Sequence, residues 1–396
     1  MKTLLFVDDD PRVLQGLQRQ LRGMRDQWGM HFVESGAKAL ELLGTTTVDV
    51  IVTDMMMPVM DGAQLLTEVM KLHPHTVRLV LSGHADREAV LRLVGPAHQY
   101  LSKPCDGEEL RNAINRAFAL RDLLTSEPLK QLATRVRCLP SLPSLHSQLT
   151  QELQKDDPDL DLVGRIISQD IGMMTKILQL VNSAFFGLAQ PISNPAEAVA
   201  YLGLNTVRAL ALSLQVFSQF DKFKVKGFSV ESLAKHGWTA GMFARRIAVS
   251  EHREQRMVDQ CFLAGMLHDV GRLILAAEMP EAYARALEVA RENKQAIWAA
   301  EQDEFGATHA QIGAYLLGLW GLPNPIIEAV AFHHHPTDCP TQAFSPVTAV
   351  HAANVFAHEQ ADTCGLLPGN DLDAAYLTSL GLGGRIETWR ERCFAE

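Results

Sequence analysis

The chain has 396 residues, which is long enough for two or three domains with separate hydrophobic cores. Hydrophobic residues make up 47% of the chain and charged residues 21%, so extensive disorder is excluded. The formal net charge of -10 argues against a broad surface for nucleic acid or anionic membranes, and it favours proteins or small molecules as partners.

Nothing in the sequence indicates export or membrane insertion. The apolar run at residues 3–7 is too short for the hydrophobic part of a signal peptide, and no stretch approaches the roughly 20 apolar residues of a membrane span. The six cysteines include no C-x-x-C pair, as is typical of reduced thiols. We therefore expect a soluble, cytoplasmic protein.

Strand and helix patterns alternate over the first 120 residues. Short, largely apolar runs, the most β-branched of them at 48–53, predict strands at residues 3–7, 31–33, 48–53, 77–81 and 99–101. Amphipathic segments between them predict helices at 37–43, 63–72 and 87–94, with further helices that begin near residues 11 and 108. Short loops join these elements, which predicts a parallel sheet covered by helices on both faces.

Carboxylates stand at the ends of two predicted strands. Asp8 and Asp9 follow the first strand, and Asp54 ends the third. Because parallel strands end at one edge of a sheet, we expect these groups to cluster and to need a cation such as Mg2+. Ser82 and Lys103 follow two further strands and would supply a hydroxyl and an ammonium. Such a set suits formation of an aspartyl phosphate, whereas the alternative is a group of acidic strand ends that are merely solvated.

Residues 1–120 closely resemble the receiver domain of bacterial two-component response regulators, which has a flavodoxin-like α/β fold with a doubly wound five-stranded parallel sheet. The resemblance implies that Asp54 is the phosphoacceptor. It also implies that Asp8, Asp9, Asp54 and the backbone carbonyl of Met56 hold Mg2+. The switch residues implied by the same resemblance are Ser82, Lys103 and the aromatic Tyr100. The partner would be a sensor histidine kinase or a phosphotransfer protein.

A helical linker is predicted at residues 121–138, where the helical pattern that begins at 108 weakens near Glu127 and Pro128. A helix that runs from the receiver toward the next domain could transmit a shift mechanically. The alternative is an inert tether.

From residue 139 the chain changes character, and helical patterns separated by Pro, Gly and Asp turns replace the alternation of strand and helix. Residues 139–355 resemble the HDOD domain, an all-α output module related to the metal-dependent HD phosphohydrolases. The motifs that carry the resemblance are Leu-Pro-Ser-Leu-Pro at 139–143, Leu-Val-Asn-Ser at 180–183, Tyr-Leu-Gly at 201–203, Leu-His-Asp-Val-Gly-Arg at 267–272 and His-His-His-Pro at 333–336. We expect residues 356–396 to form a helical extension of this HD-like domain.

A second group of candidate site residues lies in this region. His268 and Asp269 fall in an otherwise apolar segment, where an imidazole and a carboxylate are costly to bury without partners. Imidazoles and carboxylates from several helices can converge to hold a transition metal, although a single buried histidine is usually an ordinary core residue. The resemblance to HD enzymes implies a second metal site, for Fe, Mn or Zn, built from His236, His268, Asp269, His309, His333 and His334.

Two features separate the chain from the hydrolytic HD relatives. Asn354 stands where those enzymes usually carry an aspartate on a late helix, and an amide is a poorer ligand than a carboxylate. The Gly-Tyr-Pro motif of the HD-GYP phosphodiesterases is missing after the paired histidines. We therefore expect a non-catalytic output domain that gates an unknown downstream protein, through a bundle that holds a metal or is merely vestigial. The alternative is a metal-dependent phosphohydrolase for a nucleotide or cyclic di-nucleotide.

Two further expectations concern assembly. DNA binding by the output domain is disfavoured because Arg245, Arg246 and Arg253 are too few to form a basic recognition helix. Receivers and helical output domains both dimerise often, so we expect a homodimer.

Overall fold

The structure, a computed structural model, describes residues 2–82, 96–123, 129, 132–134, 136, 139–155, 157–183, 186, 188, 190–212, 218–219, 225–360 and 371–395. The predicted helix at 87–94 and most of the predicted linker lie outside these residues. Within the described ranges, no helix combines the length and the apolarity needed to cross a bilayer.

Five parallel strands form the N-terminal sheet, in the order β2-β1-β3-β4-β5. Their bounds are β1 Lys2–Val7, β2 Trp28–Val33, β3 Val50–Asp54, β4 Val77–Ser82 and β5 Gln99–Ser102. The described helices of this domain are α1 Pro11–Gln20, the 3-10 turn η1 Arg22–Met24, α2 Gly36–Leu43, α3 Gly62–Leu72 and α5 Gly107–Leu123. The predicted doubly wound α/β fold is confirmed.

Alternate residues of β1 explain why helices cover both faces of this sheet. Leu4 and Phe6 belong to a hydrophobic cluster shared with α1 and α5, whereas Leu5 and Val7 belong to a second cluster shared with α2 and α3. Both sets are buried because successive side chains of a strand point to opposite faces. The first cluster continues without a break into the helical domain, so α5 lies on the side of the sheet that faces that domain.

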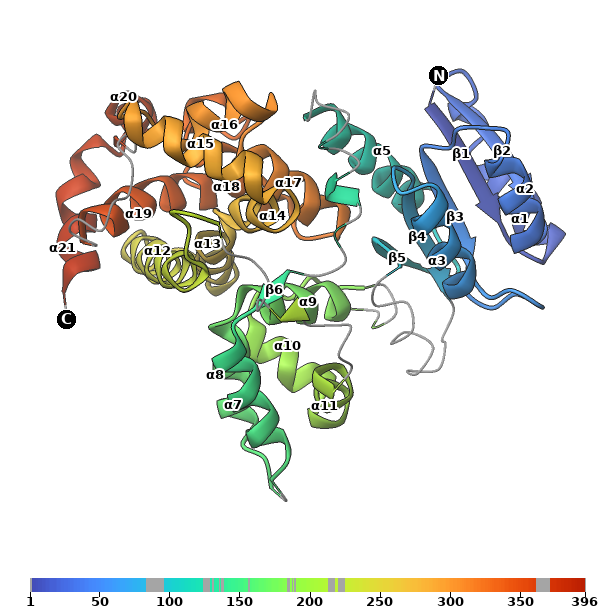
Figure 1. The fold of residues 1–396 in the computed structure, drawn as a ribbon, viewed down its shortest axis with the longest axis horizontal. Coiled ribbons are helices and arrows are strands. Elements are labelled where there is room, and N and C mark those ends of the chain that lie inside the picture. The colour runs from blue at the N-terminus through green and yellow to red at the C-terminus, as the bar shows by residue number, and fades with distance from the viewer. Residues whose placement is uncertain are drawn as a thin grey trace.

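The rest of the chain is almost entirely helical, as predicted (Figure 1). The first group of helices is α7 Pro143–Leu153, α8 Leu160–Ser168, α9 Ile171–Val181, α10 Pro195–Leu202 and α11 Leu204–Leu212. The second group is α12 Val230–Ser250, α13 Gln255–Leu267, α14 Val270–Glu278, α15 Pro280–Glu292, α16 Ile297–Phe305, α17 His309–Leu319, α18 Asn324–Phe332, α19 Pro346–Gln360, α20 Ala374–Ser379 and α21 Ile386–Phe394, with 3-10 turns η3 Pro336–Asp338 and η4 Gly383–Arg385. One pair of two-residue strands, β6 Pro140–Ser141 and β7 Ser218–Gln219, was not predicted, because two residues carry no periodic signal.

A buried polar junction joins the sheet to the helical domain. Arg78 on β4 is fully buried and donates from its guanidinium to the carbonyl oxygens of Pro96 at 2.6 Å and Thr134 at 2.8 Å. Its backbone N–H donates to Nδ1 of His98 at 3.0 Å. The carbonyl oxygen of His98 accepts a hydrogen bond from Nε2 of Gln179 on α9 at 3.2 Å. Since His98 directly precedes β5, this chain of contacts ties the β4–β5 edge to the core of the helical domain.

Candidate phosphorylation site and histidine cluster

The acidic site, which we define as Asp8, Asp54 and Lys103, lies at the carboxyl ends of β1, β3 and β5. Nζ of Lys103 is 2.6 Å from Oδ2 of Asp8 and 2.5 Å from Oδ1 of Asp54. The other oxygen of Asp54 accepts a hydrogen bond from the backbone N–H of Met56 at 3.0 Å. Parallel pairing of β1 with β3 and of β4 with β5 brings these ends to one edge, as the sequence predicted.

Burial sets the electrostatics of the acidic site. Asp8 is 2% exposed and Asp54 7% exposed. Burial raises the pKa of Asp54, and the hydrogen bond and charge of Lys103 oppose that change. Burial acts to lower the pKa of Lys103, but its hydrogen bonds to Asp54 and Asp8 outweigh burial and raise it, so the ammonium stays charged. Two buried carboxylates therefore share one ammonium, which leaves a net negative charge that suits a divalent cation.

The other residues predicted for this site lie in different environments. Asp9 is exposed. The groups of three or more close metal-ligand side chains in the described part of the chain include neither Asp9 nor Asp8 and Asp54. The Met56 side chain is 64% exposed, so only its backbone lies against Asp54. Tyr100 is buried in the hydrophobic cluster shared with α2 and α3, and burial raises the pKa of its phenol. Ser82 ends β4, but its side chain lies outside the described residues.

A close backbone contact supports the acidic site. Gly62 begins α3, and its N–H donates to the carbonyl oxygen of Met55 at 2.9 Å. A Cβ at Gly62 would lie 2.3 Å from the carbonyl oxygen of Asp54. No side chain fits at that distance, so this position requires glycine for α3 to begin in contact with the end of β3.

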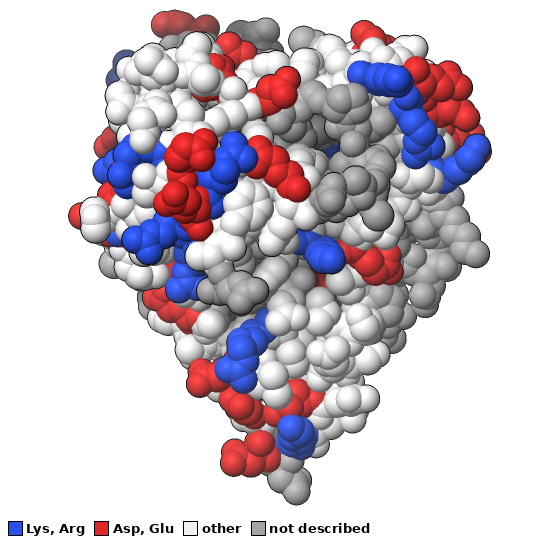
Figure 2. Space-filling model, turned by 90° about the vertical axis from the view of Figure 1, so that its left-hand side faces the viewer, with Lys and Arg blue, Asp and Glu red and all other residues white. Residues whose placement is uncertain are grey.

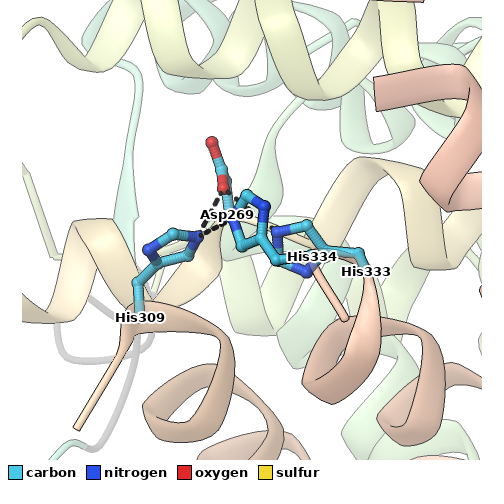
Figure 3. A group of neighbouring side chains, drawn as sticks. All are labelled: Asp269, His309, His333 and His334. Atoms are coloured by element: carbon cyan, nitrogen blue, oxygen red, sulfur yellow. Dashed lines mark hydrogen bonds and ion pairs between the residues drawn. The ribbon is translucent and has the colours of Figure 1, made fainter. Parts of the chain in front are cut away.

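The histidine cluster comprises His236, His268, Asp269, His309, His333 and His334. Its members come from α12, the α13–α14 junction, the start of α17 and the segment after α18. Oδ1 of Asp269 is 3.1 Å from Nε2 of His309, 3.6 Å from Nε2 of His268 and 3.9 Å from Nε2 of His333. Figure 3 shows the side chains from α17 and from the end of α18 converging on Asp269. The structure thus brings together residues that the sequence separates by about one hundred positions.

Two imidazole nitrogens in the cluster carry lone pairs without a hydrogen-bond partner. Nδ1 of His268 donates to the carbonyl oxygen of Gly265 at 2.7 Å, and Nδ1 of His333 donates to that of Val330 at 2.9 Å. Each Nε2 is then unprotonated in the neutral ring. Among the described residues, neither buried Nε2 has a hydrogen-bond partner, and both face Asp269. Acceptors that face a carboxylate in a buried site fit a bound metal cation, with its ligands oriented by backbone carbonyls.

Asn354 accepts a hydrogen bond from His236 and does not supply a carboxylate ligand to the cluster. Nε2 of His236 donates to Oδ1 of Asn354 at 2.9 Å, so this ring presents a hydrogen-bond donor to α19. Burial, together with the charge of His268, lowers the pKa of His236 to about 3. The sequence placed Asn354 at the position of a missing carboxylate, and the structure shows the amide within reach of the cluster.

Sequence reasoning missed two charged residues that hold the cluster. Nη1 of Arg272 donates to Oδ2 of Asp269 at 3.0 Å, and its Nε donates to the hydroxyl of Tyr283. Burial opposes ionisation of Asp269, but the neighbouring His268 and Arg272 keep its pKa well below the usual range. Glu301 accepts from Nδ1 of His309 at 2.6 Å. Arg272 lay inside a quoted motif and could have been weighed, whereas no motif marks Glu301.

A cavity of about 860 Å3 borders the histidine cluster, within the usual range for small-molecule sites. Asp269, His309 and His334 form part of its wall. The other polar side chains that line it include cations and hydroxyls, namely Lys235, Arg272, Arg291, Ser229, Ser232 and Thr239. The cavity therefore favours an anionic small molecule over an apolar one.

One face of the molecule mixes charges of both signs over its described residues. In Figure 2, which faces the side occupied by the C-terminal helices, Lys and Arg side chains lie next to Asp and Glu side chains. The described residues of this face form no single-sign patch of the kind expected at a nucleic-acid interface.

Fold and site together define an α/β receiver-like domain joined to a helical domain of the HD type. A family model for the response regulator receiver domain matches residues 4–115, and the model for the HDOD domain matches residues 139–336. The chain belongs to the HDOD family and carries an N-terminal response regulator receiver domain.

Known proteins resemble the chain in parts. An uncharacterized protein from Treponema pallidum is 27% identical over 58% of this chain and 44% of its own length. The transcriptional regulatory protein GlrR from Escherichia coli is 36% identical over 29% of this chain and 26% of its own length. The chain thus spans less than half of these relatives. The MmoQ response regulator from Methylococcus capsulatus has a similar fold, with a TM-score of 0.51 and 23% identity over 65% of this chain and 98% of that one.

Proposed function

We propose that this protein is a cytoplasmic response regulator in which Asp54 accepts a phosphoryl group from a sensor histidine kinase or a phosphotransfer protein. The observation that carries the proposal is the acidic site, where a buried Asp54 and Asp8 share Lys103 at the edge of a receiver sheet. A carboxylate oxygen of Asp54 attacks phosphorus, the phosphorus–nitrogen bond of the donor phosphohistidine breaks, and that nitrogen takes a proton from solvent.

The residues of the acidic site have separate roles in this transfer. Asp8, Asp9, Asp54 and the carbonyl of Met56 would hold Mg2+, which when bound neutralises phosphoryl oxygens. Lys103 supplies a second positive charge beside the nucleophile. In the proposal, Ser82 and Tyr100 respond to the phosphoryl group as a local two-state switch.

We further propose that the receiver controls a non-catalytic output domain through direct contact, with an unknown downstream protein as its target. The support is the buried junction, in which His98 joins Arg78 on β4 to Gln179 on α9. The same strand that follows His98 carries Tyr100 and leads to Lys103. A displacement of β5 on phosphorylation would therefore reach α9 through direct contacts. This favours transmission of the signal between the domains over an inert tether.

Chemical phosphorylation tests the first part of this proposal. Full-length protein with acetyl phosphate and Mg2+ should gain one phosphoryl mass, and Asp54→Asn should gain none, because the amide is not a nucleophile for this reaction. Asp26→Asn is the matched control, since Asp26 lies in an exposed turn remote from β3. Intact-mass measurement decides the outcome, and full labelling of Asp54→Asn would contradict the assignment.

A second candidate function is metal-dependent hydrolysis of a nucleotide or cyclic di-nucleotide. The two unpartnered Nε2 atoms and the cationic cavity favour it, whereas Asn354 in place of a carboxylate speaks against it. The histidine cluster would then bind Fe, Mn or Zn, which supplies a metal-bound nucleophile when present. Hydrolysis that requires the metal and is lost in His268→Ala would support this candidate over the non-catalytic one.

A further inference from the structure

Glu301 is a buried carboxylate that no sequence motif marks. It lies on α16, is fully buried, and contacts His309 twice. Oε2 accepts hydrogen bonds from the backbone N–H of His309 at 2.8 Å and from its Nδ1 at 2.6 Å. A carboxylate that bridges the backbone and the ring of one residue fixes both the position and the rotation of that ring.

This contact decides which nitrogen of His309 faces the cluster. Because an ionised carboxylate only accepts hydrogen bonds, Nδ1 of His309 carries the proton that is shared with Glu301. Nε2 therefore points toward the other members of the cluster, 3.1 Å from Oδ1 of Asp269 and 3.1 Å from Nε2 of His334. Glu301 itself does not touch Asp269 or His334 through any contact that the structure describes.

The backbone around His309 is fixed independently of Glu301. Thr308 and Gln311 form a reciprocal capping box at the start of α17. A Cβ at Gly271 would lie 1.9 Å from the carbonyl oxygen of His309, so α14 and α17 touch directly. Since these contacts hold the main chain, the distinct contribution of Glu301 is to the imidazole ring.

We propose that Glu301 is the positioning residue of a transition-metal centre in the histidine cluster, and that it orients His309 and strengthens it as a ligand. This inference rests on the metal binding that the second candidate function includes. A carboxylate bound to the distal nitrogen of a metal-ligating histidine fixes its tautomer and raises its basicity. The geometry matches that arrangement, with Glu301, His309 and Asp269 in series. Imidazole and carboxylate ligands suit Zn2+, Mn2+ or Fe2+.

The test compares Glu301→Gln with a matched control on the same helix. Glu304 also lies on α16 but is partly exposed and pairs with Arg285 at the surface. Full-length protein, purified without a metal-affinity tag and stripped of metal, is titrated with Zn2+ against a chromophoric chelator. Glu301→Gln should weaken Zn2+ binding roughly 10- to 100-fold, and Glu304→Gln should leave it within about twofold.

A second readout separates ligand orientation from a general structural effect. Co2+ bound in place of Zn2+ should show an altered visible spectrum in Glu301→Gln and an unaltered one in Glu304→Gln, because only the former changes the orientation of the ligand His309. Glu301→Asp keeps the charge but shortens the reach, so it should fall between wild type and Glu301→Gln. If Glu301→Gln does not fold, Glu301→Asp in the same titration decides the question.

The outcomes distinguish the two proposals. Wild-type protein that binds Zn2+ with an affinity unchanged in Glu301→Gln, or in Glu301→Asp where that is the folded variant, would overturn the role of Glu301 and leave the metal centre standing. Wild-type protein that binds neither Zn2+, Mn2+ nor Fe2+ would overturn the metal centre and the role of Glu301 together.

Discussion

The acidic site and the histidine cluster both gather charged groups at the ends of secondary-structure elements, but they differ in how the chain balances them. In the acidic site, Lys103 contacts both Asp8 and Asp54. In the histidine cluster, Arg272 binds one oxygen of Asp269, while imidazole nitrogens surround the other oxygen without hydrogen bonds from His268 or His333. The first site pairs its carboxylates with an ammonium, whereas the second surrounds its carboxylate with imidazoles and carries the amide of Asn354 beside His236. The chemistry of each site therefore depends on how its charged groups are paired, as well as on which residues it contains.

Both sites depend on a glycine that lets two backbones touch, and this shared feature gives the largest expected effects. Gly62→Ala would put a Cβ 2.3 Å from the carbonyl oxygen of Asp54, and Gly271→Ala would put one 1.9 Å from that of His309. Each should reduce the free energy of unfolding by about 3 kcal/mol, the upper end of the usual cost of overpacking. Gly16→Ala, on an open helix face, is the control and should be neutral or slightly stabilising. Denaturant titration measures all three, and equal stabilities would show that the contacts are not constraining.

A carboxylate at position 354 should make the histidine cluster more like the acidic site, because each would then hold two carboxylates. Asn354→Asp places a charged ligand next to His236, whose Nε2 is 2.9 Å from the present amide oxygen. Affinity for Zn2+ or Mn2+ should rise roughly tenfold, about 1.4 kcal/mol, because the new charge offsets that of the metal. Asn293→Asp, at the exposed end of α15, controls for the change in net charge. An affinity equal to that of wild type would place Asn354 outside the metal centre.

The carboxylate of Glu251, which has both a cationic and a neutral hydrogen-bond donor, should give a smaller effect that depends on pH. Oε1 of Glu251 accepts from Nε of Arg385 at 2.7 Å and from Nε1 of Trp389 at 2.8 Å, which ties α21 to α12. Burial opposes ionisation of Glu251, but these two partners lower its pKa. A depressed carboxylate pKa adds stability that is present above the unfolded-state value of about 4.3 and is lost as the pH falls through the lower folded-state pKa. Wild type should therefore lose stability below about pH 4.3 relative to Glu251→Gln. Parallel pH profiles for the two proteins would contradict this assignment.

The sequence predicted the acidic site well because local rules determine it. A short β-branched run followed by a carboxylate places that carboxylate at a strand end, and parallel pairing then brings Asp8, Asp54 and Lys103 to one edge. The strand and helix pattern also predicted the doubly wound sheet, although β2 begins at Trp28, three residues before the predicted start, because glycine and methionine weaken the pattern there.

The sequence predicted which residues form the histidine cluster but not how they are arranged. Resemblance placed Asp269, His309 and His333 in one set, and their spacing in the chain gave no distances. Glu301 could not be found from the sequence, since its partner is decided by how α16 packs beside the start of α17. A single glutamate in a helix is ordinarily a surface residue, and only its complete burial marks it as different. The buried junction through Arg78 was likewise invisible, because it needs the sheet edge and α9 in contact.

Backbone hydrogen exchange of the full-length protein tests the central claim most directly. Exchange is measured by mass spectrometry with and without acetyl phosphate and Mg2+, after intact mass has shown full labelling of Asp54. The expected result is a change in exchange in β5 and in α9, Ile171–Val181, that is absent in Asp54→Asn. Full phosphorylation with unchanged exchange in α9 would contradict the proposal that the receiver controls the helical domain through the buried junction.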